Sequence, residues 1–522
     1  MTLKRLFTID HIYYILVFAL MFPLILLRDY TPANELRYLN IVDDALKTGN
    51  FFSFYNHGEI YADKPPLYFW IIMLGKKIFG SHQIWFLSLF SLLPAFVIQF
   101  TMDRWTRAEL PNEYQSSAKL LLFTSALFMG GAIILRMDML MSMFITLALY
   151  VFYRMYSGRE RKYDKYLLPL CIFLAIFSKG PIGIIIPVVS ILTFLTIKGK
   201  IKDSGKYLGF RTWGILLLLC SVWFSLVWVE AGNSYLNDLL FNQTFNRAVS
   251  SFHHKEPFYY YFQVFWYSFA PWSILFFALI LLGIKNKLIK TDIDKLFLTV
   301  VLTSFLVLSI VSAKIEIYML PVFPFVAYLS VIILMRLKNK KWIVYFMIAL
   351  SLIAIMALPL FLLSKNDITF SWLNEIHTSI IWGLISLALF GFLSLYFLIF
   401  RKNIIRSINS ISIGILTVIF IVSFEMPFLN SYVGYENMCK SGIELSENSK
   451  QYIVYGIRRP ENMKVYLGES VIIAEKDDIM SDIYGGSILF ISDRALRKDF
   501  SLREYIEKKP STKIGDNLVV KL

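Results

Sequence analysis

The segment from residue 34 to residue 67 begins with NELRY (34–38) and ends with DKPPL (63–67). It carries acids, an arginine, a lysine before a proline pair and aromatic residues, yet strongly apolar segments lie on both sides of it. Charged residues held against apolar segments are costly, and in membrane proteins they mark functional sites. We therefore predict a catalytic loop at residues 29–81, supported by a scaffold that lies in the lipid.

The composition agrees with a membrane scaffold. Of the 522 residues, 57% are apolar, and the mean hydropathy is +0.59. These values are too high for a set of water-soluble domains and predict a multi-pass membrane protein. The net charge of +15 does not indicate a nucleic-acid partner, because most lysines and arginines fall in short clusters between apolar runs, as in cytoplasmic loops.

Apolar runs of near-spanning length predict an all-α polytopic fold with about 13 transmembrane helices. They lie near residues 10–28, 82–102, 117–132, 136–155, 166–178, 181–198, 211–230, 261–284, 294–312, 317–335, 341–363, 377–400 and 407–425. If the N-terminus is cytoplasmic, alternation of the runs places the basic clusters at 104–107, 154–165, 198–211, 285–295, 336–341 and 401–406 on the cytoplasmic side. That is the distribution that the positive-inside rule requires of an integral plasma-membrane (inner-membrane) protein.

The odd number of spans predicts that the C-terminus lies outside. From residue 429 the composition is that of a soluble domain, so we divide the chain into a membrane domain, 1–428, and a small extracytoplasmic α/β domain, 429–522. Short strands are predicted at 452–456, 463–467, 487–492 and 517–522, with a helix at 501–509.

The first outer loop contains two candidate site segments. Apolar positions at helical spacing predict an amphipathic helix at residues 34–48, with Glu35 and Arg37 in its first turn. The alternative is an ordinary interfacial helix. Lys64 stands before Pro65 and Pro66, which stiffen the chain, and a held ammonium group suits a lipid phosphate. The alternative is a lysine that reaches up to the headgroups.

Other candidates lie at predicted outer helix ends. Asp138 opens the run at 136–155, and we expect it to find a partner other than Arg136, which is not on the same helical face. Lys179 in a Gly-Pro turn, and Lys314 with Tyr318, could contact an anionic lipid head. For Lys179, and for Lys314 with Tyr318, an ordinary structural role is an equally good alternative to ligand binding.

A divalent cation is the one cofactor candidate. His253 and His254 lie in an outer loop and could bind a metal together with Asp63 or Glu256. Two adjacent histidines without a partner at i+4 are a weak signal of such a site.

Taken together, these motifs resemble the GT-C superfamily of membrane glycosyltransferases, in the branch of lipid A aminoarabinose transferases and protein O-mannosyltransferases. Segments 34–38 and 63–67 resemble its Asp-Glu-x-Arg-Tyr and acid-Lys-Pro-Pro elements, and RMD (136–138), SKGP (178–181), HHKEPF (253–258) and the segment 314–321 follow in matching order. The resemblance covers residues 10–340.

The resemblance implies an inverting transferase that moves a sugar from a polyprenyl-phosphate carrier to an extracytoplasmic acceptor, which is lipid A, a glycan or a protein. Carboxylates would activate the acceptor, and cations would stabilise the leaving phosphate. The implied catalytic residues are Glu35, Asp138 and Asn34, and the implied substrate-binding residues are Arg37, Tyr38, Tyr61, Lys64, Lys179, Lys314 and Tyr318.

One position departs from the family pattern. Asn34 stands where the family has its first acid, and an amide cannot accept a proton at neutral pH. Glu35 or Asp138 must then supply the anionic role, or the protein is an inactive homologue. A transporter or flippase of a lipid-linked sugar is the other alternative, although transporters carry charges in mid-span, where this chain has almost none.

Overall fold

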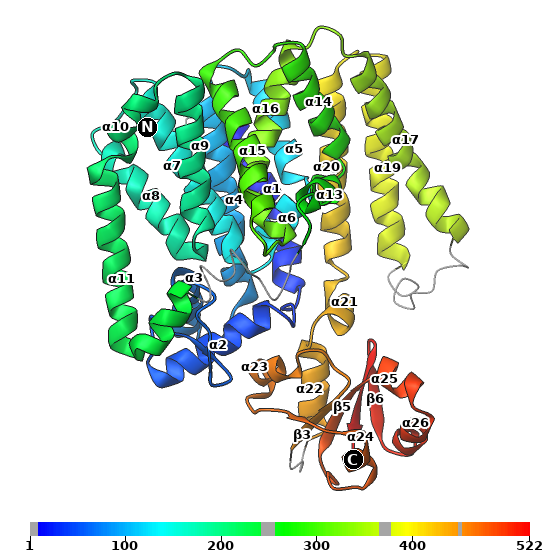
Figure 1. Ribbon diagram of the computed structural model, residues 1–522. Helices are drawn as coiled ribbons and strands as arrows, with labels where there is room; N and C mark the ends of the chain where they lie inside the picture. Colours follow the sequence, from blue (N-terminus) through cyan, green and yellow to red (C-terminus); the bar gives the residue numbers. More distant parts are fainter. Residues whose placement is uncertain (1–8, 242–255, 365–376, 447–450) are drawn as a thin grey trace, which may run out of the picture.

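The computed structural model describes residues 9–241, 256–364, 377–446 and 451–522. A bundle of helices stands on a small α/β region that lies at one end (Figure 1). The bundle helices are α1 (Ile9–Leu27), α4 (Ile84–Thr106), α5 (Asn112–Phe123), α6 (Ala126–Ile133), α7 (Met137–Tyr156), α8 (Asp164–Lys179), α9 (Ile182–Ile197), α11 (Phe210–Asn237), α13 (Tyr260–Ser268), α14 (Ser273–Lys285), α15 (Asp292–Ile310), α16 (Phe323–Arg336), α17 (Lys341–Ser364), α19 (His377–Ile399) and α20 (Ile404–Ser423). Each predicted apolar run falls on one of these helices or on a pair of them, except that the run at 317–335 begins on the 3-10 helix η4 (Glu316–Val322).

The predicted fold class is confirmed. However, fewer than 13 of the described helices are by themselves long and apolar enough to cross a membrane. Within the described residues, eight helices are long and apolar enough to cross a membrane, or up to ten if two bent pairs each count as one span. The pairs are α5 with α6, bent by 72°, and α13 with α14, bent by 118°. Pro271 lies in the second break, where its missing N–H prevents a continuous helix. Hydropathy cannot detect such bends.

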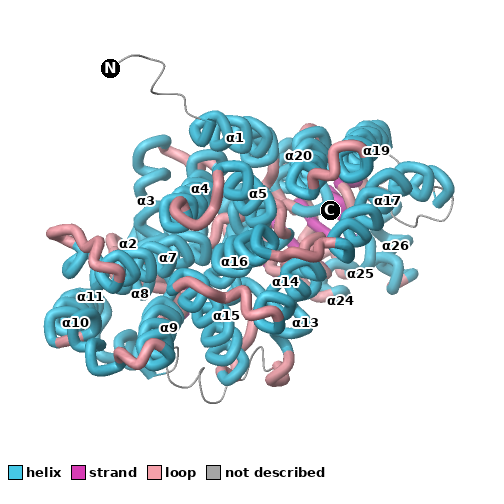
Figure 2. Tube along the Cα trace, turned by 90° about the horizontal axis from the view of Figure 1, so that it is seen from above, coloured by secondary structure: helices cyan, strands magenta, loops and turns pink. Residues whose placement is uncertain are grey.

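Helix α16 is the buried centre of the bundle. The apolar stretch within residues 316–336, which contains α16, is 94% buried. Figure 2 shows α16 surrounded by α4, α5, α14 and α15. A helix that is apolar on every side is buried by neighbours or lipid. By contrast, α17 and α19 are mostly exposed, at 17% and 22% burial, as expected of helices that face lipid.

The first loop folds as α2 (Glu35–Thr48), the hairpin β1 (Tyr55–Asn56) with β2 (Glu59–Ile60), and α3 (Leu67–Phe79). The predicted amphipathic helix is therefore confirmed, and it ends at Gly49 in the left-handed conformation, which glycine adopts without strain. Glu230 of α11 fastens the loop to the bundle, because its carboxylate accepts the backbone N–H groups of residues 51–53 at 2.5–2.7 Å.

The C-terminal region carries a five-stranded sheet in the order β4-β3-β5-β7-β6. Its strands are β3 (Tyr452–Tyr455), β4 (Ile472–Ile473), β5 (Ile488–Ser492), β6 (Ser511–Ile514) and β7 (Asn517–Lys521), with α21 (Met426–Val433), α22 (Glu436–Glu444), η5 (Pro460–Met463), α23 (Lys464–Leu467), α24 (Lys476–Met480), α25 (Asp493–Lys498) and α26 (Phe500–Glu507). Strands β3 and β5 pair in parallel, and β5 and β7 pair antiparallel. Three predicted strands and the predicted helix are confirmed, but the strand predicted at 463–467 is wrong: this segment is helical.

This region does not stand apart from the membrane bundle. It lies at the same end as α2 (Figure 1), and residues such as Leu36, Met438 and Phe490 belong to one hydrophobic core. Asn462 donates a hydrogen bond to the carbonyl of Pro32 at 2.9 Å. The C-terminal region therefore packs directly on the first loop. The domain boundary expected at 428/429 falls inside α21.

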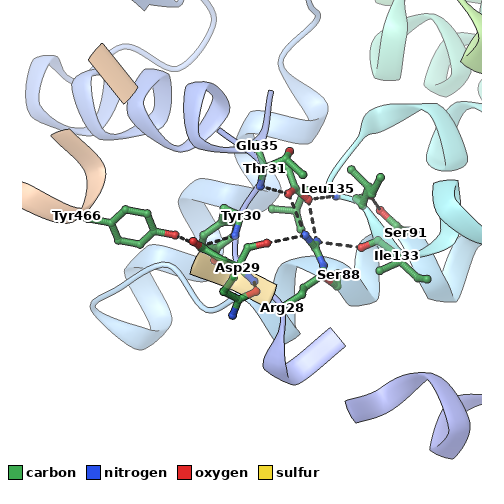
Figure 3. Close-up of polar contacts among 12 residues, drawn as sticks. Arg28, Asp29, Tyr30, Thr31, Glu35, Ser88, Ser91, Ile133, Leu135 and Tyr466 are labelled. Atoms are coloured by element: carbon green, nitrogen blue, oxygen red, sulfur yellow. Dashed lines mark hydrogen bonds and ion pairs between the residues drawn. The ribbon is translucent and has the colours of Figure 1, made fainter. Parts of the chain in front are cut away.

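A buried ion pair joins the first loop to the bundle (Figure 3). Arg28 and Glu35 form two parallel hydrogen bonds of 2.9 and 2.8 Å. The carboxylate of Glu35 also accepts the N–H groups of Thr31 and Leu135, both at 2.6 Å. The guanidinium of Arg28 donates further to the Ile133 carbonyl at 3.1 Å. Glu35 is completely buried and ties α2 to the connection between α6 and α7.

We predict that Glu35→Gln destabilises the protein. The variant leaves the buried charge of Arg28 without its counter-charge, and breaking a buried pair in this way costs about 3–5 kcal/mol. The melting temperature in detergent should fall clearly. Glu59→Gln is the matched control, since Glu59 lies in the same loop and is exposed. Equal melting temperatures for both variants would show that the ion pair does not hold the loop.

Candidate functional site

A cavity of about 300 Å³ lies where the first loop meets the bundle. Two lysines from distant parts of the chain, Lys64 and Lys179, contribute to its lining. Most of the remaining lining is apolar or aromatic: Ala62, Pro65, Ile176, Pro181, Ile182, Ile184, Ile185, Trp223, Phe224, Leu239, Leu240, Val311, Ala313 and Tyr318. A cavity with apolar walls and a few convergent charges is the usual form of a ligand site.

Lys64 is held at the cavity by its neighbours in the chain. Its ammonium lies 2.8 Å from the carboxylate of Asp63, and the two side chains are only 11% and 17% exposed. Pro65 and Pro66 follow, and α3 begins at Leu67, so the backbone here has little freedom. Burial alone would lower the pKa of Lys64, but Asp63 and nearby tyrosines outweigh it and raise the pKa above its ordinary value. Lys64 therefore stays cationic.

Lys179 is paired with Asp138 at the other side of the cavity. Its ammonium contacts the Asp138 carboxylate and lies 4.8 Å from the centre of the Tyr318 ring. Asp138 is completely buried and also accepts a hydrogen bond from Arg136 at 3.2 Å. Arg136 is extended, with φ −147° and ψ 143°, so its side chain reaches Asp138 from outside the helix. Asp138 thus has the expected second partner, but the expectation that Arg136 would not contact it is wrong.

The charges of the site leave an excess of one positive charge. Arg136, Lys64 and Lys179 stand against Asp63 and Asp138. Both lysines line the cavity, as does Asp63, whereas Asp138 lies behind Lys179. This arrangement suits an anionic group joined to an apolar tail. Asp138 would then act by positioning Lys179, and Asp63 is the carboxylate nearest to a ligand.

Four predicted residues form a cluster beside the cavity rather than in its lining. Arg37 donates to the side-chain oxygen of Asn34 at 3.1 Å and lies 5.7 and 5.6 Å from the ring centres of Tyr38 and Tyr61. Tyr61 connects this cluster to the cavity, because its hydroxyl donates to Asp63 at 3.4 Å. Tyr38 is 1% exposed and packs against Phe69, and its contact with substrate stays a prediction.

Two further predicted site residues lie outside the cavity lining. Glu35 was expected to be catalytic, but it is completely buried, is bonded on both carboxylate oxygens and does not line the cavity. These contacts hold the backbone of the first loop against the bundle, and a catalytic role of Glu35 stays a prediction. Lys314 is also buried and donates to the backbone carbonyl of Glu256 at 2.7 Å. It holds the segment before η4 (Glu316–Val322) in place, while Tyr318 of that segment lines the cavity.

The metal prediction concerns residues at the edge of the described structure. His253 and His254 lie outside the described residues. Asp63 is engaged by Lys64. Among the residues that the structure does describe, there is no group of three or more histidine, cysteine or acidic residues that could hold a metal ion. The divalent cation stays a prediction.

The contribution of α11 to the cavity and to the position of the first loop was not predicted from the sequence. Trp223 and Phe224 form part of the cavity wall, and Tyr235 accepts a hydrogen bond from the N–H of Phe54 at 3.0 Å and donates to the Tyr61 carbonyl at 3.1 Å. One signal was present in the sequence. Glu230 is an acid at the end of a long apolar run, and Gly232, where the helix kinks, follows two residues later.

Comparisons with known proteins agree with the fold. Residues 63–228 match the family described as dolichyl-phosphate-mannose-protein mannosyltransferase. An uncharacterised protein of Aquifex aeolicus is 27% identical over 308 residues, which is 59% of this chain and 60% of that protein. The undecaprenyl phosphate-alpha-4-amino-4-deoxy-L-arabinose arabinosyl transferase of Wigglesworthia glossinidia brevipalpis is 27% identical over 347 residues, covering 63% and 59% of the two chains. The matches thus span about 60% of the length of these relatives.

A solved structure is similar over nearly the whole chain. The crystal structure of ArnT from Cupriavidus metallidurans bound to undecaprenyl phosphate superposes with a TM-score of 0.73 at 16% identity, and covers 98% of this chain and 97% of its own. Its apo structure gives a TM-score of 0.72. At this identity the likeness establishes the fold. The chain therefore has the fold of this ArnT structure, and parts of its sequence are similar to an undecaprenyl phosphate-alpha-4-amino-4-deoxy-L-arabinose arabinosyl transferase and to the dolichyl-phosphate-mannose-protein mannosyltransferase family.

Proposed function

We propose that this protein is a glycosyltransferase that moves a sugar from a polyprenyl-phosphate carrier to an acceptor outside the cytoplasm. One observation carries the proposal: Lys64 and Lys179, each paired with a carboxylate, line one cavity whose walls are mostly apolar. The ammonium groups suit the phosphate, and the apolar walls suit the start of a prenyl chain. The undecaprenyl phosphate bound by the similar ArnT structure supports the same ligand class.

We propose a one-step displacement at this site. The acceptor oxygen attacks the anomeric carbon while the bond from that carbon to the phosphate oxygen breaks, so the configuration inverts. The electron pair of the broken bond leaves with the polyprenyl phosphate, and Lys64 and Lys179 stabilise that charge. The acceptor's proton passes to a carboxylate. Asp63 is the carboxylate in the cavity lining, so we assign it the role that Asn34 and Glu35 cannot fill.

The location of the site supports an extracytoplasmic acceptor. Helix α2 and the C-terminal region lie at one end of the bundle (Figure 1), and the cavity is lined by residues of the same first loop. The opposite end carries Arg104, Arg107 and Arg154 at the ends of α4 and α7. The positive-inside rule places the arginine-rich end in the cytoplasm. The acceptor is then a component of the cell envelope such as lipid A, a glycan or a protein, which the C-terminal region is positioned to contact.

A transfer assay tests the proposal directly. Purified protein in detergent is incubated with a radiolabelled undecaprenyl-phosphate sugar and an envelope lipid or protein fraction. Label should pass to the acceptor, with release of undecaprenyl phosphate. If label moves across vesicle membranes without reaching an acceptor, the protein is a flippase. If neither event occurs with any lipid-linked sugar, the inactive-homologue reading holds.

We predict that Lys64→Met lowers the rate of transfer by roughly 100-fold or more, because loss of one preorganised charge at a developing anion has about that effect. The folded protein should persist, as Asp63 can be neutralised by a proton. Lys47→Met is the matched control, since Lys47 lies exposed in the same loop and should transfer at the normal rate. Normal transfer by Lys64→Met would remove the lysine from the mechanism.

Two variants at Asp138 distinguish its role in positioning Lys179 from its contribution to the stability of the fold. Asp138→Asn leaves Arg136 and Lys179 without a buried counter-charge, so both the melting temperature and the rate of transfer should fall. The double variant Asp138→Asn/Lys179→Met removes one of the two cations. It should recover much of the melting temperature and remain inactive, because the cavity has lost one of its two lysines. Recovery of transfer in the double variant would contradict the role given to Lys179.

A further inference from the structure

A second, larger cavity lies at the opposite end of the bundle. Its volume is about 630 Å³, and it is formed by the ends of α4 and α7, the start of α5 and the connection from α7 to α8. Helix α7 begins beside Asp138 and ends beside this cavity. Its 20 residues span about 30 Å, which is roughly the thickness of the hydrocarbon core. The two cavities therefore lie on opposite sides of the membrane.

The second cavity is strongly basic. Five arginines line it: Arg104, Arg107, Arg154, Arg159 and Arg161. The one acidic residue in the lining is Asp103, whose carboxylate is bound by Lys119 at 2.8 Å and by the Tyr328 hydroxyl at 2.6 Å. Arg154 is paired with Asp164. Within the described residues, the other four guanidinium groups have no ion pair, so the cavity presents their charge.

The wall also contains buried donors. Trp105 is 5% exposed, and in the described part of the chain its indole N–H has no hydrogen-bond acceptor. The same holds for the Nε of Arg154, whose guanidinium lies 5.0 Å from the ring centre of Tyr150. Buried donors in a native structure are nearly always satisfied by protein, water or a ligand. Donors of this kind in the wall of a basic cavity indicate an acceptor-rich ligand.

One side of the cavity faces the lipid. Tyr14 of α1 and Phe100 of α4 belong to its lining, and Phe100 is 53% exposed on the outer surface of the bundle. A ligand with a charged head in the cavity can therefore extend apolar chains along α1 and α4. Soluble anions would make no use of this apolar side.

We propose that this cavity binds the phosphate head group of an anionic membrane phospholipid. Guanidinium groups match the oxygens of a phosphodiester with paired hydrogen bonds, and basic pockets between membrane helices on the cytoplasmic side suit such head groups. The site is separate from the cavity of Lys64 and Lys179, so its ligand is a structural or regulatory lipid and not the sugar donor.

The test measures the melting temperature of the purified full-length protein in a neutral detergent. Short-chain phosphatidylglycerol should raise it in a saturable manner, by several degrees, whereas short-chain phosphatidylcholine and inorganic phosphate should not. The variant Arg104→Gln/Arg107→Gln/Arg159→Gln/Arg161→Gln should lose this shift. Its melting temperature without lipid should stay normal, because these side chains are exposed and make no ion pairs in the described structure.

A matched control removes four exposed cations elsewhere: Lys285→Gln/Arg401→Gln/Lys402→Gln/Arg406→Gln. It should keep the full shift. If this control loses the shift as well, general surface charge and not the cavity attracts the lipid, and the proposal fails. An equal shift with inorganic phosphate would also overturn it in favour of a soluble anion. Should the fourfold variant be unstable, Arg107→Gln/Arg161→Gln is expected to halve the shift, and an unchanged shift would overturn the proposal.

Discussion

The structure depends on one buried ion pair, between Arg28 at the end of α1 and Glu35 at the start of α2. A buried pair is stable only if its remaining hydrogen-bonding groups are satisfied. Here the carboxylate accepts the N–H groups of Thr31 and Leu135, and the guanidinium reaches Ser88 and Ile133. The pair therefore joins the first loop, α4 and the connection before α7. It fixes the positions of Lys64, which lies later in that loop, and of Asp138, which begins α7.

This constraint explains why the charged residues at this end of the bundle have different tasks. Glu35 and Lys314 are buried and hold backbone segments together. Lys64 and Lys179 are held by Asp63 and Asp138 and reach the cavity. The apolar wall from α8, α9 and α11 completes a site for an amphipathic anion. Loop, bundle and C-terminal region thus form one unit at this end of the membrane.

The sequence was sufficient to predict the helices and to predict at which end of the bundle the charged site residues lie. Apolar runs mark buried or lipid-facing helices, and Gly49 marks the end of α2. The roles of the acids could not be predicted, because they depend on partners far away in the chain. Glu35 meets Leu135, and Asp138 meets Lys179, and neither contact leaves a periodic signal. The strand predicted at 463–467 is wrong because a short apolar run fits a strand and a helical turn equally well.

The most direct measurement is a cryo-EM structure of the protein in nanodiscs with a non-hydrolysable undecaprenyl-phosphate sugar. We predict phosphate oxygens within about 3 Å of the ammonium groups of Lys64 and Lys179, the prenyl chain along the apolar wall, and Glu35 still bonded to Arg28. A phosphate bound elsewhere, or a Glu35 carboxylate turned toward the sugar, would contradict it.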